Sequence, residues 1–295
     1  MITIVGGTGN LGTALIPRLL ARGLEVRVIT RDRSHVSSQM PSSVEVAVAD
    51  VRDRAALSQA IAGSTTVISA ITGFGGRDAA GAPAIDRDGN RNLIAAASAG
   101  GAEHMILLSV AQASADHPIE LFRMKFAAEQ DLRSSGLAWT IIRPTAYMET
   151  WVGIVGGPLL ATGKTRIFGA GNNPINFVSA QDVAGLVDLA VVEPGLRNRI
   201  VDVGGPANLT FNELTACFEA TTGRSGEKSH APLPMMRAMS VLLKPIKPIL
   251  AAQMHASVVM DTRDMRFDGL AARRDFPTVA STSLEAMIAR DYLPA

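Results

Sequence analysis

Three glycines near the start of the chain, Gly6, Gly9 and Gly12, are spaced so that the backbone could hold a phosphate. A turn leaving a buried strand needs a residue that tolerates unusual backbone angles, and a phosphate needs bare Cα atoms to reach backbone N–H groups. The G-x-x-G-x-x-G spacing leaves a glycine-rich hairpin as the alternative. An apolar strand before the glycines and a helix after them favour a dinucleotide pyrophosphate at the helix N-terminus. The predicted contacts are Gly6, Thr8, Gly9, Asn10, Leu11 and Gly12.

Two arginines, Arg31 and Arg33, follow a second predicted strand over residues 25–30. In NAD proteins an acidic residue about 20 positions past the glycines binds the ribose 2′-hydroxyl. A guanidinium at this place suits a 2′-phosphate instead, because its N–H fork matches phosphate oxygens. The sequence therefore predicts NADP as the cofactor, with NADPH preferred over NADH. Two solvated arginines flanking Asp32 are the alternative.

Further cofactor contacts are predicted where later strands end. One group of contacts follows the strand over residues 44–49, where side chains could contact the edge of the adenine. Another lies at the end of the strand over residues 66–71, which opens a glycine loop, residues 72–76, expected to pass beneath the cofactor. The predicted contacts at these two places are Asp50, Val51, Ala70, Ile71 and Thr72.

Strands and helices alternate at short intervals from the start of the chain to Pro144. Such alternation requires right-handed crossovers between parallel strands, with helices covering both faces of the sheet. The sequence therefore predicts an α/β protein with a doubly wound parallel sheet, the Rossmann arrangement. The predicted strands occupy residues 2–5, 25–30, 44–49, 66–71, 105–109 and 139–142.

The pattern changes beyond Pro144, where glycine-rich loops alternate with short strands such as residues 199–203. We expect residues 1–150 to form the NAD(P)-binding Rossmann domain and residues 151–295 to form a smaller mixed lobe that binds substrate. The two parts are expected to be interwoven, with residues 177–203 returning to the sheet.

Local signals predict where several helices begin and end. Asp53 suits the N-cap of a helix, and Thr210 with Glu213 forms a capping box. An alanine-rich helix is predicted over residues 83–98, where a glycine pair ends it. A further helix is predicted over residues 119–134.

Composition excludes several classes of protein. The net charge is +1, from 28 Lys and Arg against 27 Asp and Glu, so no surface for nucleic acid is predicted. The one cysteine, Cys217, excludes a disulfide framework and favours a reducing compartment. A strand that begins at residue 2 leaves no room for a signal or transit peptide. We therefore expect a cytoplasmic protein.

The segment from Leu233 to Met260 is the one candidate for a membrane span, since it is rich in Met, Leu, Val and Ala. Charged residues and prolines interrupt it, so it lacks the ~18 uninterrupted apolar residues that a span needs. We expect two short helices broken near the prolines, and no integral membrane segment. Burial against another copy of the chain, or contact with a membrane surface, are alternatives for its apolar residues.

Five stretches of the chain carry a combined pattern. They are Gly6–Gly12 (GGTGNLG), Thr30–Arg33 (TRDR), Lys125–Glu129 (KFAAE), Ser135–Pro144 (SGLAWTIIRP) and Phe177–Ala184 (FVSAQDVA). This combination resembles the NmrA-like, atypical short-chain dehydrogenase/reductase (SDR) proteins of the NAD(P)-binding Rossmann superfamily, over nearly all of the chain. It is specific for the family and not for a substrate.

The resemblance implies a catalytic Ser, Tyr and Lys: tyrosine transfers the proton, lysine makes the tyrosine more acidic and holds the ribose, and serine orients the carbonyl. Ser109 and Lys125 match the serine and the lysine, and both are implied to contact the cofactor, as is Pro144. Leu121 stands where the tyrosine of Y-x-x-x-K would be. Tyr147 is the plausible substitute near the nicotinamide, or else a wall for the substrate.

Lys125 could itself act as the general acid, as family members that lack the tyrosine are thought to do. Only five of the 28 Lys and Arg residues are lysine, so a lysine on an otherwise apolar helix face indicates a role. The alternative is an i,i+4 salt bridge between Lys125 and Glu129 on an exposed face.

A set of apolar and aromatic side chains is predicted to cover the cofactor and to line a pocket for a small apolar substrate. His117, beside Pro118, lies at the predicted mouth, where it either donates to the substrate or caps its own loop. No group of His, Cys, Asp and Glu has the spacing of metal ligands, so no metal is predicted. The predicted substrate residues are Phe74, His117, Phe122, Tyr147, Met148, Trp151 and Phe168.

The function predicted from these residues is an NADPH-dependent oxidoreductase that reduces a small hydrophobic carbonyl, quinone or enone by hydride transfer. The alternative is a non-catalytic NmrA-like protein that senses NADP or binds a regulatory protein partner. Leu121, in place of the expected tyrosine, is the reason that the alternative stays open.

Overall fold

The computed structural model describes residues 1–74, 81–269 and 274–293. Two compact units divide the chain. The first unit holds residues 1–143 and 183–202, and the second holds residues 144–182 and 203–295. Of the glycine loop predicted over residues 72–76, Gly75 and Gly76 lie outside the described residues.

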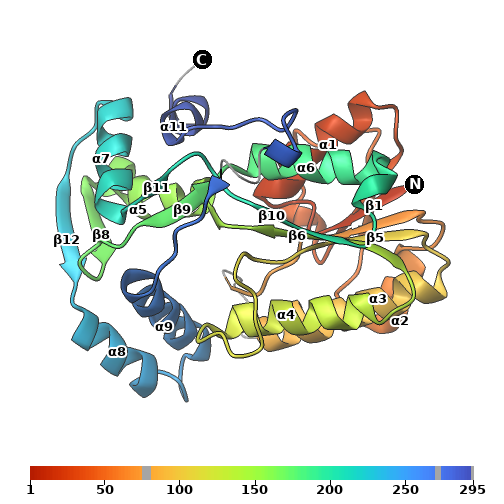
Figure 1. The fold of residues 1–295 in the computed structure, drawn as a ribbon, viewed down its shortest axis with the longest axis horizontal. Helices are drawn as coiled ribbons and strands as arrows, with labels where there is room; N and C mark the ends of the chain where they lie inside the picture. The colour runs from red at the N-terminus through yellow and green to blue at the C-terminus, as the bar shows by residue number, and fades with distance from the viewer. Residues whose placement is uncertain (75–80, 270–273, 294–295) are drawn as a thin grey trace. The chain divides into compact units, whose positions relative to one another are not determined.

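Seven strands form one sheet in the described part of the first unit. They are β1 (Ile2–Val5), β2 (Val26–Thr30), β3 (Glu45–Val48), β4 (Thr66–Ser69), β5 (His104–Leu108), β6 (Ala138–Pro144) and β10 (Arg199–Val203). Their order is β10-β6-β5-β4-β1-β2-β3, and the pairs from β6 across to β3 are parallel (Figure 1). The α/β class with a Rossmann-like parallel sheet is therefore confirmed.

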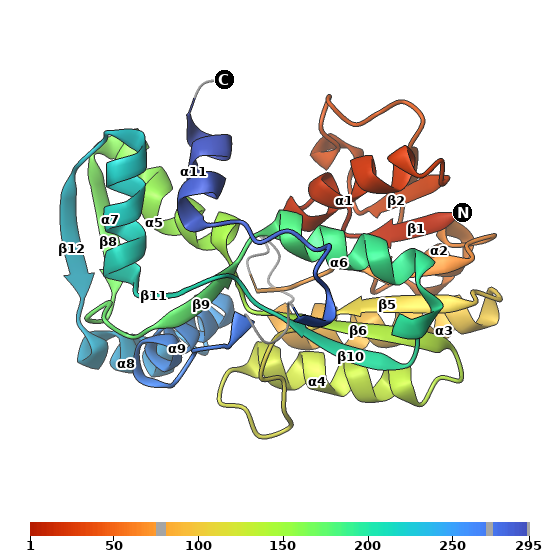
Figure 2. The ribbon, with the colours of Figure 1, turned by 45° about the horizontal axis from the view of Figure 1, so that its top comes forward.

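Helices cover both faces of this sheet. On one face lie α1 (Asn10–Ala21) and α6 (Ala180–Val192); on the other lie α2 (Arg54–Ala60), α3 (Asn90–Ala99) and α4 (Glu120–Arg133) (Figure 2). Every residue of β1, β4 and β5 is buried, which explains why their apolar runs show no polar alternation. The sheet can therefore hold side chains and loops firmly at the ends of its strands.

The predicted caps are confirmed. The Asp53 carboxylate accepts from the N–H groups of Ala55 and Ala56 at the start of α2. Thr210 and Glu213 form the reciprocal capping box of α7 (Phe211–Thr222).

The single helix predicted over residues 83–98 is not uniform. Residues Pro83–Gly89 form a π-helical segment, and α3 begins after it at Asn90. The Asn90 side-chain amide donates to the carbonyl oxygen of Asp86 at 2.7 Å, so a side chain supplies a partner for a main-chain group next to the wider turn. Such π-helical turns are frequent at functional sites.

The second unit contains two small sheets and several helices. One sheet has the order β11-β9-β7 and the other pairs β12 with β8. Its described elements are β7 (Ala146–Tyr147), α5 (Met148–Thr162), β8 (Lys164–Phe168), β9 (Ile175–Val178), β11 (Asn208–Leu209), α7, β12 (Glu227–Ala231), α8 (Leu233–Leu242), α9 (Pro248–Thr262) and α11 (Leu284–Tyr292).

The segment from Leu233 to Met260 forms two helices, α8 and α9, as predicted from its prolines. Lys247 precedes the first residue of α9, Pro248, at a position where proline is compatible with a helix. Within the described part of the chain, no helix is both long and apolar enough to cross a membrane.

His104 in β5 is buried against Thr140 of β6 and makes stability depend on pH. Thr140 donates its hydroxyl to the carbonyl oxygen of Leu196 at 2.8 Å, so it accepts from Nε2 of His104 at 2.9 Å. Burial, with the positive charge of Arg197, lowers the pKa of His104 from 6.5 to about 4.

Because the unfolded chain protonates this imidazole below pH 6.5 and the folded chain does not, stability is lost as the pH falls from 6.5 toward 4. We predict that the free energy of unfolding drops by about 2 kcal/mol more between pH 7 and pH 5 in the natural protein than in His104→Gln. Urea unfolding at the two pH values measures this difference. Equal losses in the two proteins would contradict it.

Candidate active site

The glycine turn between β1 and α1 is shaped by close backbone contacts. Gly6 has φ of 86°, a left-handed conformation, and a Cβ there would lie 2.7 Å from the carbonyl oxygen of Ala70. A Cβ on Gly12 would overlap the backbone of Gly7. The chain therefore requires glycine at both ends of the turn.

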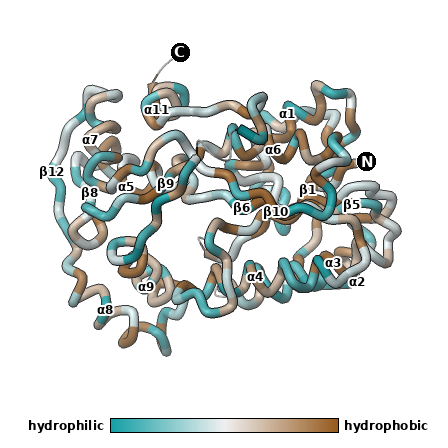
Figure 3. The backbone as a smooth tube through the Cα atoms, in the orientation of Figure 1, coloured by the Kyte–Doolittle hydropathy of each residue, from teal (hydrophilic) through white to brown (hydrophobic). Residues whose placement is uncertain are grey.

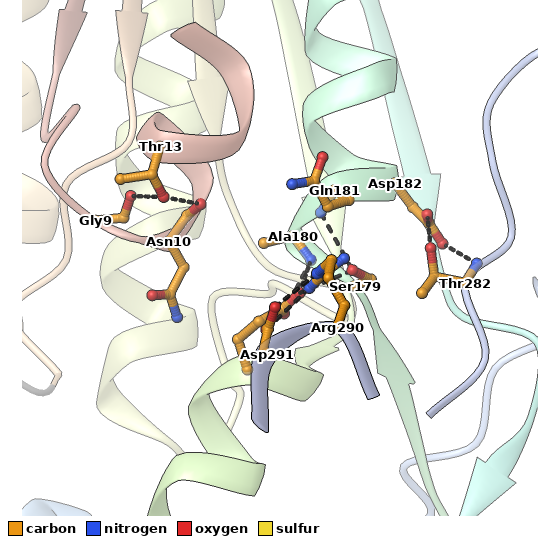
Figure 4. A network of polar contacts seen from close by, with 11 residues as sticks. Gly9, Asn10, Thr13, Ser179, Ala180, Gln181, Asp182, Thr282, Arg290 and Asp291 are labelled. Atoms are coloured by element: carbon orange, nitrogen blue, oxygen red, sulfur yellow. Dashed lines mark hydrogen bonds and ion pairs between the residues drawn. The ribbon is translucent and has the colours of Figure 1, made fainter. Parts of the chain in front are cut away.

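The turn leaves the start of α1 open to an anion. Its N-cap is Gly9, which has no side chain to cap the helix, and its first turn carries no acidic residue. Thr13 turns its hydroxyl back to the carbonyl oxygens of Gly9 and Asn10 (Figure 4). Uncapped N–H groups and the helix dipole attract a phosphate, so these residues fit the pyrophosphate of a dinucleotide.

The predicted nucleotide residues lie at the ends of β2 and β3. Arg31 is exposed directly after β2, whereas the Arg33 guanidinium donates to the carbonyl oxygen of Val46 at 3.0 Å. Asp50 forms a bidentate ion pair with Arg52, with N–O distances of 2.9 and 2.5 Å. This pair holds the pKa of the Asp50 carboxyl below its usual value. Arg31 also lowers this pKa, so its charge lies close to the end of β3.

Lys125 is buried in α4, with 4% of its surface exposed. Its ammonium donates to the carbonyl oxygen of Ile71 at 2.7 Å and to that of Leu108 at 2.9 Å. The third neighbour is a carboxylate oxygen of Asp86 at 3.1 Å. The alternative of an exposed salt bridge to Glu129 is therefore wrong, and Lys125 ties together the ends of β4 and β5.

Asp86 was not among the predicted site residues, although it completes this arrangement. It is fully buried, and its second carboxylate oxygen accepts from the N–H of Gly73 at 2.8 Å. Burial raises the pKa of Asp86, while Lys125 and the Gly73 N–H oppose that rise. Lys125 and Asp86 together hold the loop that follows β4.

A signal for Asp86 exists in the sequence. Asp86, Asn90, Leu93 and Ala97 recur at intervals of three and four residues, and all four are fully buried. Two polar residues on the apolar face of a helix indicate a buried polar network. The Ser69 hydroxyl at the end of β4 donates to Asn90 at 2.6 Å, which joins the strand to this network.

A second buried network surrounds Glu129, one turn along α4 from Lys125. The Arg143 guanidinium donates to both carboxylate oxygens of Glu129, at 2.8 and 2.5 Å, and the Ser109 hydroxyl donates to the same carboxylate. The charges of both Arg143 and Glu129 act on Asp202 in β10. Burial raises the pKa of Asp202, Arg143 lowers it, and Glu129 raises it further. The predicted serine is therefore fixed by a protein carboxylate.

Glu129→Gln should lower the free energy of unfolding by about 3 kcal/mol, since it leaves the Arg143 guanidinium without its charged partner. Chemical denaturation measures the loss. The matched control is Asp131→Asn on the same helix, whose partner Arg91 is half exposed, and it should cost less than about 1 kcal/mol. Equal losses in the two variants would mean that the buried pair is worth no more than a surface pair.

His117 caps its own loop, which is the second of its two predicted roles. Its Nδ1 accepts from the N–H of Ile119 at 3.2 Å, and its ring stacks on Phe122 with 4.2 Å between centroids. Phe74, in the loop after β4, donates its N–H to the hydroxyl of Thr72 at 3.3 Å. Contact of these residues with a substrate stays a prediction.

The other predicted substrate residues belong to the second unit. Tyr147 precedes α5, and burial, aided by the nearby Glu149, raises the pKa of its phenol above the ordinary value. Trp151 packs between Phe168 and Phe211, with ring centroids 6.4 and 5.0 Å away. Met148 is buried at the start of the same helix. Trp151 thus belongs to an aromatic cluster with Phe168 and Phe211, and substrate contact by Tyr147, Met148, Trp151 and Phe168 stays a prediction.

A carboxylate in α5 also orders the second unit. The Glu149 carboxylate accepts from the Ser179 hydroxyl and the Ala180 N–H at the start of α6, and it pairs with Arg290 of α11 at 3.2 Å. Asp182 accepts from the hydroxyl and N–H of Thr282 (Figure 4). Within the described residues, no group of His, Cys, Asp and Glu has the geometry of a metal site.

The sequence model described as NAD(P)H-binding matches residues 6–191. The chain belongs to the NAD(P)H-binding family. The match begins at the first glycine of the turn and spans Asp86, Lys125, Glu129 and Arg143 of the two buried networks.

Two relatives within this family are reductases by name. A (4-alkanoyl-5-oxo-2,5-dihydrofuran-3-yl)methyl phosphate reductase of Streptomyces griseus is 30% identical over 225 residues, which cover 76% of this chain and 74% of the relative. An NAD(P)H azoreductase of Xenophilus azovorans is 26% identical over 226 residues, with 76% and 74% covered.

A solved structure has the same fold. The NADPH-dependent quinone oxidoreductase of Escherichia coli, determined with NADPH, superposes with a TM-score of 0.76 at 21% identity, covering 98% of this chain and 99% of that one. The predicted resemblance to NmrA-like, atypical SDR proteins is confirmed, and the chain is an NAD(P)H-dependent oxidoreductase of this family.

Proposed function

We propose that the protein is an NADPH-dependent reductase of a small hydrophobic carbonyl, quinone or enone, and that conjugated acceptors are its preferred substrates. The observation that carries the proposal is the commitment of the Lys125 ammonium to Ile71, Leu108 and Asp86. The N–H groups of this ammonium point to oxygen atoms of the protein, so they are not directed at a substrate. We therefore assign Lys125 to positioning the strand ends rather than to protonating a substrate.

The glycine turn and the residues after β2 would hold the cofactor. Gly6 to Gly12 would receive the pyrophosphate, and Arg31 would face a 2′-phosphate with Arg33 beside it. When bound, NADPH supplies a hydride from its nicotinamide ring. Ile71 and Thr72, at the loop that Lys125 and Asp86 hold, would form one wall of its site.

The available acids favour a particular class of acceptor. Leu121 has no proton to give, and the raised pKa of Tyr147 makes its phenol a weak acid. A simple ketone becomes a localised, strongly basic alkoxide when it accepts a hydride, so its reduction needs an acid placed to protonate the oxygen as the hydride arrives. A quinone or enone spreads the added negative charge over its conjugated system, and water can protonate it afterwards.

The names of similar proteins support this class. The relative from Xenophilus azovorans is named an azoreductase, and the structure from Escherichia coli is titled a quinone oxidoreductase. Azo groups and quinones are both conjugated acceptors. These names suggest the class of substrate for this chain and no individual compound.

Arg31→Asp should shift cofactor preference from NADPH toward NADH. The carboxylate would repel a 2′-phosphate and accept a hydrogen bond from a 2′-hydroxyl, so we expect the ratio of NADPH to NADH affinity to fall by about tenfold or more, a charge-assisted contact being worth about 1.5–3 kcal/mol. Fluorescence titration of both cofactors measures the ratio. Arg54→Asp, an exposed arginine in α2, is the control and should leave the ratio unchanged.

The experiment that tests the proposed reaction follows the absorbance of NADPH with paired acceptors. Cyclohexenone is compared with cyclohexanone, and naphthoquinone with 2-tetralone, whose carbonyl is not conjugated with its ring. We expect turnover of the conjugated member of each pair and much slower turnover of the saturated ketone. Faster reduction of the saturated ketones would contradict the assigned class, and tight NADPH binding with no turnover would favour the sensing alternative.

A further inference from the structure

Three strongly exposed hydrophobic side chains lie close in sequence where α8 ends and turns toward α9. Val241, Leu242 and Ile246 are 71%, 66% and 75% exposed, whereas no other large hydrophobic side chain among the described residues exceeds 49%. We call these three residues the apolar tip. In Figure 3, brown segments along α8 and at this turn alternate with teal ones. Such an exposed group marks a contact surface.

The tip is the outer end of an ordered helix pair. The carbonyl oxygen of Leu243 accepts from the N–H groups of Ile246 and Lys247, which closes the turn. Behind it, Met236 of α8 packs in one cluster with Val258 of α9 and Ala231. The two helices lie side by side in both ribbon views (Figure 1, Figure 2). The tip is therefore presented by a packed support.

The charged residues that flank the apolar tip in the sequence are all cationic. Arg237, Lys244 and Lys247 are exposed, and the 30 residues from Ala231 to Met260 contain no Asp or Glu. Elsewhere the chain mixes both signs, since its net charge is only +1. Apolar side chains with cations beside them are the pattern that inserts at the interface of an anionic bilayer.

We propose that the apolar tip docks the protein on the surface of membranes that contain anionic lipids. The tip would enter the headgroup region while Lys244, Lys247 and Arg237 contact lipid phosphates. A second copy of the chain fits this surface less well, because a two-fold symmetric interface places the same surface patch on both sides. Such an interface would bring the cations of both copies together, and residues 231–260 offer no Asp or Glu to pair with them.

Co-sedimentation of the full chain with lipid vesicles tests the proposal. Vesicles of phosphatidylcholine alone are compared with vesicles that also contain phosphatidylglycerol, at low and high salt. We expect binding to the anionic vesicles only, weakened by salt. Each cation near a surface contributes about fivefold to such binding, so Lys244→Gln with Lys247→Gln should weaken it by about 25-fold.

Two further variants separate apolar insertion from charge. Leu242→Gln with Ile246→Gln removes the apolar contact and should also release the protein from the vesicles. The controls are Leu160→Gln, which removes a hydrophobic side chain that is 44% exposed on α5, and Lys164→Gln, which removes an exposed lysine of β8. Both controls should bind as the natural protein does, and circular dichroism should be the same for all variants.

Several outcomes would overturn the proposal. They are no binding of the natural protein to anionic vesicles, equal binding of the tip variants and the natural protein, and equal binding to neutral vesicles. Sedimentation equilibrium supplies the other test. A dimer that the tip variants dissociate, without vesicle binding, would assign the tip to a second copy of the chain.

Discussion

Lys125→Met should lower the free energy of unfolding by about 3–5 kcal/mol, the usual cost of removing one partner from a buried ion pair. The substitution leaves the carboxylate of Asp86 buried without a cation, and it leaves the carbonyl oxygens of Ile71 and Leu108 without their donor. Methionine fills nearly the same volume, so the loss reports the charge and the hydrogen bonds. Chemical denaturation measures it.

The pH dependence of this variant separates the charge from packing. A buried Asp86 without Lys125 is stable only when protonated, so the stability deficit of Lys125→Met should shrink as the pH falls from 8 to 5. Asp86→Asn combined with Lys125→Met should recover part of the loss. Lys164→Met is the matched control, because its exposed ion pair with Glu227 should be worth less than about 1 kcal/mol. A deficit independent of pH would assign the loss to packing alone.

Gly12→Ala should destabilise the first unit by about 3 kcal/mol and weaken NADPH binding at least tenfold, because the added Cβ would overlap the backbone of Gly7. The overlap can be relieved only if the turn opens, and the opened turn no longer presents the N-terminus of α1 to a phosphate. Thermal unfolding and fluorescence titration with NADPH measure the two effects.

Two glycine variants serve as comparisons for Gly12→Ala. A Cβ on Gly157 in α5 meets no atom within 4 Å, so Gly157→Ala should leave both stability and NADPH binding nearly unchanged. A Cβ on Gly9 would lie 3.6 Å from its nearest neighbour, the carbonyl oxygen of Gly6. Gly9→Ala should therefore fold normally and lose only affinity for NADPH, since we expect its Cα to face the phosphate of the bound cofactor. Normal NADPH binding by Gly12→Ala would contradict the role of the turn.

Local patterns were sufficient to predict the order and type of the main elements. The glycine turn, the caps at Asp53 and Thr210, and the break between α8 and α9 each depend on residues that are close in sequence. The π-helical start of the helix at Pro83 was not predicted, because the alanine-rich pattern indicates a helix and does not specify its hydrogen-bond spacing. It is accompanied by the hydrogen bond from the Asn90 side chain to the Asp86 carbonyl.

The partners of the buried charges could not be predicted from spacing. Lys125 and Glu129 are four residues apart, which suggests that they pair, but their true partners are Asp86 and Arg143. Those partners come from the segment after β4 and from β6, so only the folded sheet brings them together. The sequence indicated that Lys125 has a role, but only the folded structure shows which partners Lys125 and Glu129 contact.

The central claim is that this protein transfers a hydride from NADPH to a conjugated acceptor. The most direct test uses NADPH that carries deuterium at the transferred position of its nicotinamide ring, with cyclohexenone as the acceptor and mass spectrometry of the product. We predict that the saturated ketone product contains one deuterium bound to carbon, and that Gly12→Ala forms much less of it. Product without deuterium, or bound NADPH that yields no product with any conjugated acceptor tested, would contradict the claim.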